Sequence, residues 1–271
     1  MRWLVRTVRE SILALLAIAT VMLPGVLRAP AMVGGAPPAA DGAGRSVVMI
    51  LGSYGTACTA TAVARTLLLT AAHCVQPGAD YKLVDREPGQ SLSEVPLLKD
   101  VARIERDPQF DLKRLFAHLA TADVALIKLV DPLPARIPPV PIGGETETVA
   151  VGDTLTVAGY GVTVRGDGRT GGVVRAGSLV VTGQPGSLQI RLFDPATKGQ
   201  SAGLGACAGD SGAPAFRRDE NGNLTIVGVV SWSTGPNLGG GCGGLTGITP
   251  LVRYRGWILD TARLLGSPLA P

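Results

Sequence analysis

The chain has 271 residues, of which 46% are hydrophobic, 17% are charged and 4% are aromatic. This balance excludes an intrinsically disordered chain, and the 37 glycines and 20 prolines indicate a fold rich in turns. The net charge is +4, and four arginines against one glutamate in the first 31 residues account for +3 of it. We expect no nucleic-acid partner, because the remainder has no basic stripe interleaved with aromatic residues.

The first 31 residues have the pattern of an export signal. Three arginines precede an apolar segment from Ser11 to Leu27, and Ala29-Pro30-Ala31 fits an A-x-A cleavage site. We predict cleavage after Ala31 and a secreted or periplasmic protein that is not attached to a membrane once the signal is removed. The alternative is an uncleaved anchor, since the apolar segment is near the minimum length for spanning a bilayer. Pro24 and the cleavage site argue against it.

Short runs of Val, Leu, Ile and Thr predict a mostly β protein in two halves. Strands are expected first at Ser46–Leu51, Thr66–Thr70, Tyr81–Val84, Val95–Ile104 and Val124–Val130. Five prolines in Asp131–Pro141 predict a linker, because proline cannot donate to a sheet. Further strands are expected at Thr154–Ala158, Val173–Val181, Leu188–Phe193, Leu224–Trp232 and Thr246–Thr249.

A closing helix is predicted from Leu251 to Leu265, where apolar residues recur at helical spacing. The expected organisation is a signal at 1–31, a first β-domain with the linker at 32–141, and a second β-domain with the helix at 142–271.

Four cysteines in an exported chain predict two disulfides, since an oxidising compartment lets them persist. By spacing alone, Cys58, Cys74, Cys207 and Cys242 allow three pairings. No C-x-x-C pair or His/Cys cluster indicates a metal site, so we predict neither a metal nor a cofactor.

Three short segments carry candidate chemistry: Thr70–Cys74 with His73, Asp123–Leu129, and Cys207–Pro214 with Ser211. Alone, each has an ordinary interpretation as a loop histidine, a turn or cap aspartate, and a glycine-rich turn. Together, in this order, they predict a catalytic triad. A serine hydroxyl needs a base to take its proton, and that imidazole needs an acceptor on its other nitrogen.

The same segment supplies candidate donors for an oxyanion. Gly209, two residues before the serine, lets the backbone turn so that the N–H groups of Gly209 and Ser211 converge. The Gly-x-Ser-x-Gly motif of α/β-hydrolases is absent at Ser211, and the histidine precedes the serine, which is the wrong order for that fold. We interpret the other histidine, His118, as structural or exposed.

With these motifs the chain resembles the chymotrypsin/trypsin family over Met32–Trp257. Met32-Val33-Gly34-Gly35, Gly159-Tyr160-Gly161 and Ser231-Trp232 add to the likeness. The resemblance implies an all-β fold of two six-stranded antiparallel β-barrels and a C-terminal α-helix, with the triad between the barrels. It also implies the disulfides Cys58–Cys74 and Cys207–Cys242.

The resemblance further implies an activation mechanism. In the family, a new N-terminal ammonium pairs with the aspartate before the nucleophile, which is Asp210 here. Signal cleavage would expose Met32, so we hypothesise that signal removal itself activates the enzyme, although Met32 departs from the family's branched residue.

The resemblance also assigns a specificity pocket. Gly205 takes the floor position, which leaves no carboxylate to attract Arg or Lys, and Ser233 and Thr246 take the walls, which favours small uncharged residues. If Gly244 were the wall instead, larger apolar residues could enter. The backbone at Ser231, Trp232 and Ser233 is expected to pair with substrate as an added strand.

The predicted function is therefore a secreted serine endopeptidase, a monomer that acts on proteins or peptides. The alternatives are a non-catalytic homologue that uses the same fold as a binding module, and an esterase with the same machinery. The presence of all three triad residues argues against the non-catalytic homologue.

Overall fold

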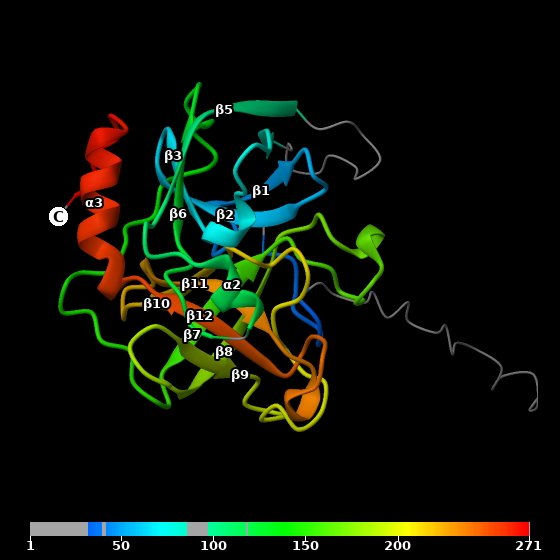
Figure 1. Ribbon diagram of the computed structural model, residues 1–271. Helices are drawn as coiled ribbons and strands as arrows, with labels where there is room; N and C mark the ends of the chain where they lie inside the picture. The colour runs from blue at the N-terminus through cyan, green and yellow to red at the C-terminus, as the bar shows by residue number, and fades with distance from the viewer. Residues whose placement is uncertain (1–31, 40–41, 86–96, 118, 271) are drawn as a thin grey trace, which may run out of the picture.

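The structure is a computed structural model that describes residues 32–39, 42–85, 97–117 and 119–270. The predicted signal and His118 lie outside the described residues. Twelve strands form two closed antiparallel barrels, and a helix lies near the C-terminus. In Figure 1 the first barrel is above and the second below. The predicted fold class is confirmed.

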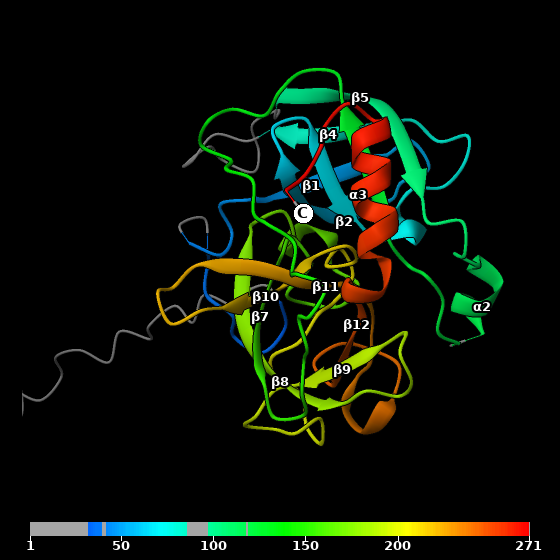
Figure 2. The same cartoon turned by 90° about the vertical axis from the view of Figure 1, so that its left-hand side faces the viewer.

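The first barrel has the strand order β1-β2-β3-β6-β5-β4. Its strands are β1 (Val47–Gly52), β2 (Ala57–Ala64), β3 (Leu67–Thr70), β4 (Tyr81–Asp85), β5 (Leu97–Arg106) and β6 (Ala125–Leu129). A short helix, α2 (Leu112–Phe116), projects from the segment between β5 and β6 (Figure 2). Asp111 caps it by accepting bonds from two first-turn N–H groups.

The second barrel has the strand order β10-β11-β12-β9-β8-β7. Its strands are β7 (Thr154–Gly159), β8 (Arg175–Gly183), β9 (Ile190–Phe193), β10 (Pro214–Arg218), β11 (Leu224–Ser233) and β12 (Leu245–Pro250). Single 3₁₀ turns are η1 (Ala72–Cys74), η2 (Gly168–Thr170), η3 (Pro236–Leu238) and η4 (Val252–Tyr254), and the last precedes α3 (Arg255–Leu264).

Every strand predicted from the sequence overlaps an observed strand, but β2 and β10 were missed. Four of the eight residues of β2 are alanines, which have weak strand preference, yet its six central residues are buried. β10 begins with Pro214, which is tolerated at the first position of a strand, and ends with two arginines. Both segments form strands because they pair with neighbouring strands of a closed barrel, which their local sequences do not indicate.

The two ends of the described chain pack on opposite barrels. Met32 and Ala36 are fully buried in the core of the second barrel. Tyr254, Ile258 and Ala262 of η4 and α3 are buried in the cluster that fills the first barrel, and α3 runs beside β6 (Figures 1 and 2). Each barrel therefore includes a segment from the other end of the sequence.

Candidate active site

His73 and Asp123, both from the first barrel, are joined by two hydrogen bonds. His73 lies in η1, directly after β3, and its Nδ1 is 2.7 Å from Oδ2 of Asp123. The backbone N–H of His73 also donates to Oδ1 of Asp123 at 2.9 Å. Asp123 is fully buried, while 19% of the His73 side chain is exposed. The carboxylate therefore fixes the orientation of an imidazole that still reaches solvent.

Ser231 gives the buried carboxylate a third donor. Its hydroxyl donates to Oδ2 of Asp123 at 2.5 Å. The register between β11 and β12 shifts between Val230 and Trp232, so Ser231 is the extra residue of a bulge, a device that re-aims a side chain. Sequence reasoning assigned Ser231 only a backbone role toward substrate, because nothing in the local sequence marks the bulge.

Ser211 is held by backbone bonds to both barrels. Its carbonyl accepts from the N–H of Thr59 in β2 at 2.8 Å, and the next residue, Gly212, donates to Val230 of β11 at 2.8 Å. A Cβ on Gly212 would lie 2.2 Å from the carbonyl oxygen of Thr59, so only glycine fits this close approach. Ser211 is partly exposed, as a nucleophile must be.

The Ser211 hydroxyl and His73 share no hydrogen bond among the described residues. Catalytic hydrogen bonds are often long in unliganded enzymes and tighten when substrate binds. The structure thus contains a histidine–aspartate pair with the geometry that a general base and its orienting group require, and a serine loop held by backbone hydrogen bonds.

The loop before Ser211 has the backbone form predicted for oxyanion donors. The N–H of Asp210 bonds to the carbonyl of Cys207 at 3.0 Å, and Gly209 has φ +95. This is the glycine position of a type II turn. Within the described chain, the N–H groups of Gly209 and Ser211 donate to no other protein group. Both remain available to a ligand.

Thr59 clamps this loop and was missed by the sequence analysis. Its hydroxyl donates to the carbonyl of Gly209 at 2.7 Å and accepts from the N–H of Tyr160 at 3.0 Å. Because Thr59 belongs to β2, its hydroxyl joins the first barrel to the loop of the second barrel that contains Gly209. The only sequence signal was its place next to Cys58.

Asp210 is fully buried and accepts bonds from the backbone N–H groups of Gly161, at 2.8 Å, and Cys207, at 2.9 Å. Burial raises the pKa of its carboxyl to about 7, against the smaller lowering effect of the two bonds. Gly159 and Gly161 are required beside it, since a Cβ on either would come within 2.3 Å of a carboxylate oxygen.

Met32, the predicted partner of Asp210, is fully buried, and the next residue, Val33, forms an antiparallel bridge with Gly205. Met32 and Asp210 share no hydrogen bond or ion pair in the described part of the chain. In the full chain Ala31 precedes Met32, so the backbone nitrogen of Met32 belongs to a peptide bond and carries no charge.

The three predicted pocket residues lie together. Ser233 and Thr246 are paired across β11 and β12. A Cβ on Gly205 would be 3.5 Å from Oγ1 of Thr246, which also accepts from the N–H of Ala206 at 3.0 Å. Gly244 instead donates its N–H to the carbonyl of Thr234. Thr246, rather than Gly244, therefore faces Ser233.

The disulfides pair Cys58 with Cys74 and Cys207 with Cys242, as predicted. The first ties β2 to the turn that carries His73. The second ties the oxyanion loop to the loop before β12. Cys58, His73 and Cys74 bring possible metal-ligand atoms together, but the two sulfurs are bonded to each other and offer no thiolate.

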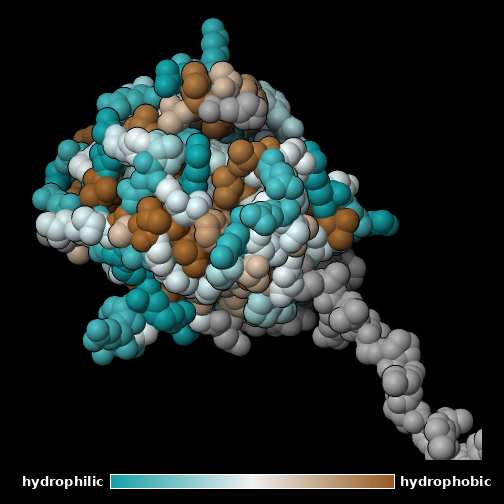
Figure 3. Space-filling model, turned by 90° about the horizontal axis from the view of Figure 1, so that it is seen from below, coloured by the Kyte–Doolittle hydropathy of each residue, from teal (hydrophilic) through white to brown (hydrophobic). Residues whose placement is uncertain are grey.

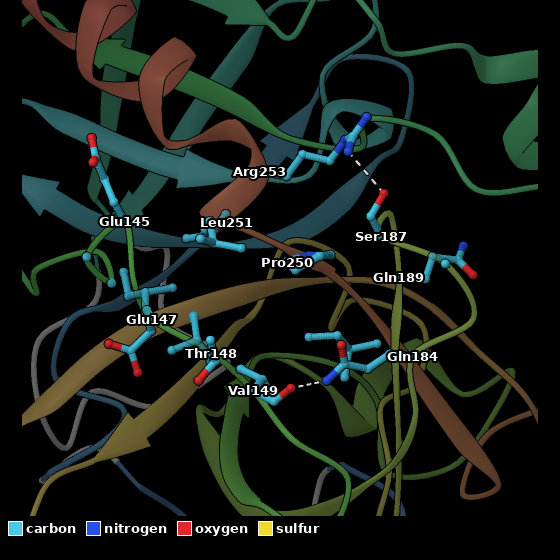
Figure 4. Close-up of a pocket in the computed structure, with 17 residues that line it drawn as sticks. Glu145, Glu147, Thr148, Val149, Gln184, Ser187, Gln189, Pro250, Leu251 and Arg253 are labelled. Atoms are coloured by element: carbon cyan, nitrogen blue, oxygen red, sulfur yellow. Dashed lines mark hydrogen bonds between the residues drawn. The ribbon is translucent and has the colours of Figure 1, made fainter.

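A cavity of about 270 Å³ lies between the segment before β7, the β8–β9 loop and the end of β12 (Figure 4). Two of its polar side chains are bonded to neighbours: Arg253 donates to Ser187, and Gln184 donates to the carbonyl of Val149. No predicted site residue lines it. We find no catalytic arrangement among these lining residues.

No helix among the described residues is both long and apolar enough to cross a membrane.

The chain is similar in sequence to several known proteases. The relatives include "Serine proteinase stubble" of Drosophila melanogaster, which is 29% identical over 52% of this chain. "Suppressor of tumorigenicity 14 protein homolog" of Bos taurus is 27% identical over 67%, and "Transmembrane protease serine 9" of Rattus norvegicus is 28% identical over 76%. The aligned parts make up 19%, 23% and 19% of those proteins, so the chain spans about a fifth of their length. A family model described as Trypsin matches residues 32–258, and the chain therefore belongs to the trypsin family of serine proteases.

Proposed function

We propose that the chain is an active, exported serine endopeptidase with Ser211 as nucleophile, His73 as general base and Asp123 as the group that orients the base. The observation that carries the proposal is the 2.7 Å contact between Nδ1 of His73 and the fully buried carboxylate of Asp123. This contact fixes the imidazole so that Nε2 is free to accept a proton.

The reaction proceeds by acyl transfer. His73 takes the hydroxyl proton as Oγ of Ser211 attacks the substrate carbonyl, and the N–H groups of Gly209 and Ser211 stabilise the oxyanion. Collapse breaks the C–N bond, His73 gives its proton to the leaving amine, and an ester remains on Ser211. Water then attacks the ester by the same steps, which releases the acid and restores the enzyme.

The cut is proposed to follow small uncharged residues. The Ser233 and Thr246 side chains occupy the walls, and Gly205 places no carboxylate at the floor. Profiling with peptides that differ only at the residue before the cut tests this. Preference for Ala or Val should give way to larger apolar residues in Thr246→Gly. A preference for Arg in the unmodified enzyme would overturn the assignment.

Activation is proposed to follow directly from signal removal. A buried carboxylate without a cation is costly, and the ammonium of Met32 after cleavage would offset that cost. N-terminal sequencing of exported, active protein should give Met32 first. An active protein that begins elsewhere would defeat this part of the proposal.

The function is tested with a chain that begins at Met32 and a set of uncharged peptides. We expect hydrolysis that Ser211→Ala abolishes, while the circular dichroism spectrum stays unchanged. A correctly processed, folded chain that binds these peptides without cutting any of them would instead favour a binding module.

A further inference from the structure

We propose that Arg191, beside the apolar cavity next to Trp232, selects substrates with an acidic side chain three or four residues before the cut. This inference deepens the proposed endopeptidase function and rests on it. It concerns which peptides the enzyme prefers, beyond the residue at the cut itself.

The cavity, of about 450 Å³, lies where the two barrels meet beside the segment expected to pair with substrate. The first barrel contributes Leu115 of α2 and Leu119. The second contributes Trp232, Ser233 and Thr234, together with the residues of three other segments: Gln189, Arg191, Leu238, Gly239, Gly240 and Leu245. None of the described lining residues is acidic, and Arg191 is their only charged one.

A row of residues across three strands places Arg191 next to the indole. Trp232 of β11 pairs with Gly247 of β12, and Gly247 pairs with Arg191 of β9. Directly paired residues project from the same face of a sheet. A Cβ on Gly247 would lie 2.0 Å from Cε2 of Trp232, so the indole covers the position that a side chain on β12 would fill. The ring therefore extends across β12 toward the strand of Arg191.

The Arg191 guanidinium is free to bind a ligand. Its neighbours Ile190 and Leu192 are buried, whereas Arg191 is exposed, as strand alternation requires for an outward-facing residue. Arg191 has no hydrogen-bond or ion-pair partner in the described part of the chain. A cation beside an apolar surface, without a carboxylate of its own, is complementary to an acidic side chain with an apolar stem.

Apolar side chains at the rim add surface for such a ligand. Leu119 is 49% exposed, and Leu238 is 71% exposed. Leu238 has φ 62, a left-handed conformation that is unfavourable for a residue with a Cβ. On the face of the molecule seen from the side of the second barrel, apolar groups are bordered by hydrophilic side chains (Figure 3). Strain that holds an apolar side chain exposed is typical of binding sites.

The path of the substrate connects the cavity to the cut. Val230 bonds to Gly212 and Ser231 bonds to Asp123, so this end of β11 lies next to the nucleophile loop. A peptide added along Ser231–Ser233 advances about 3.3 Å per residue. Its residues upstream of the cut therefore pass Trp232 and reach the cavity after two or three positions.

The test uses peptides that are cut after Ala and are identical except for Glu or Gln at one position. That position is the third or the fourth residue before the cut, with Ala counted as the first. The unmodified enzyme should have a kcat/KM about fivefold higher for Glu than for Gln at one of these positions, the upper range for an exposed ion pair. Arg191→Gln should remove this ratio and Arg191→Glu should invert it. The ratio should also fall in about 0.5 M NaCl, because salt at this concentration screens the attraction between exposed charges over distances of only a few ångströms.

Arg263→Gln on α3 is the matched control, because Arg263 is an exposed arginine that does not line the cavity. It should leave the ratio unchanged. A ratio of one in the unmodified enzyme at both positions, or a ratio that survives Arg191→Gln, would overturn the inference. Peptide affinities measured with Ser211→Ala keep the two proposals apart. If the unmodified chain hydrolyses no peptide, but the Glu peptide binds Ser211→Ala in a way that depends on Arg191, the proposed function is wrong and the proposed selectivity is supported.

Discussion

At the scale of single residues, Asp123 is the most constrained polar group of the site. Three donors from His73 and Ser231 converge on its two oxygens, and no part of it is exposed. Such a carboxylate can accept from the ring N–H of His73 but cannot donate to it. The tautomer of His73 thus depends on the charge of Asp123.

Asp123→Asn should lower kcat by about 10⁴-fold, because an amide in place of the carboxylate favours the wrong tautomer of His73. The variant should remain folded, since asparagine has nearly the same shape. Peptide hydrolysis and thermal unfolding measured on the same samples check both statements. A loss smaller than tenfold would mean that Asp123 does not orient the base.

Asp210 is expected to make the free energy of unfolding depend on pH. Its folded pKa of about 7 lies above the ordinary 3.8, so the folded state holds a proton more tightly than the unfolded state does. The stability from this group is fully present below pH 4 and is lost as the pH rises through 7. A chain that begins at Pro30, and so lacks an ammonium at Met32, should lose on the order of 4 kcal/mol of unfolding free energy from this group between pH 4 and pH 8.

Urea unfolding at these two pH values measures the difference. Asp210→Asn in the same extended chain should flatten the dependence, and a chain that begins at Met32 should show less of it, because its ammonium compensates the carboxylate. An equal pH dependence in the extended chain and in its Asp210→Asn variant would contradict the account.

Residues with their own sequence motifs could be predicted, and residues defined only by tertiary contacts could not. His73, Asp123 and Ser211 each sit in a recognisable segment, and the structure brings His73 and Asp123 into contact. The hydroxyl of Thr59 acts on Gly209, 150 residues away. No local pattern reports a bond over that separation.

At the scale of elements, the same distinction separates the predicted strands from the missed ones. Ten strands have runs of branched or leucine residues, while β2 and β10 depend on neighbours in a closed barrel for their burial. The bulge at Ser231 is likewise a property of the β11–β12 pairing rather than of the β11 sequence. The missed elements include the strand that carries Thr59.

The terminal helix α3 is expected to stabilise the first barrel through its buried face. Ile258 is fully buried against the first barrel, and Leu264 is 85% exposed. Ile258→Ala should lower the free energy of unfolding by about 2–5 kcal/mol through lost burial and a cavity. Leu264→Ala, the same kind of truncation on the same helix, should change it by less than about 0.5 kcal/mol. Urea unfolding compares them, and equal effects would show that α3 does not stabilise the first barrel.

At the scale of the whole molecule, the candidate site exists only because the barrels meet. The first barrel supplies His73, Asp123 and the Thr59 clamp, and the second supplies Ser211, Gly209 and the pocket. The two ends of the described chain each pack on the distant barrel, which holds the halves together. Separate expression of either half should therefore give no site.

The most direct test of the triad is covalent labelling of the chain that begins at Met32 with a fluorophosphonate. This reagent phosphonylates a serine whose proton is taken by a positioned base, forming a phosphonate ester on Oγ and releasing fluoride. Peptide mass spectrometry should find one adduct, on Ser211, in the unmodified protein and none in a folded His73→Ala variant. An unlabelled Ser211 in the processed, folded protein, or equal labelling in His73→Ala, would contradict the assignment of His73, Asp123 and Ser211 as a working triad.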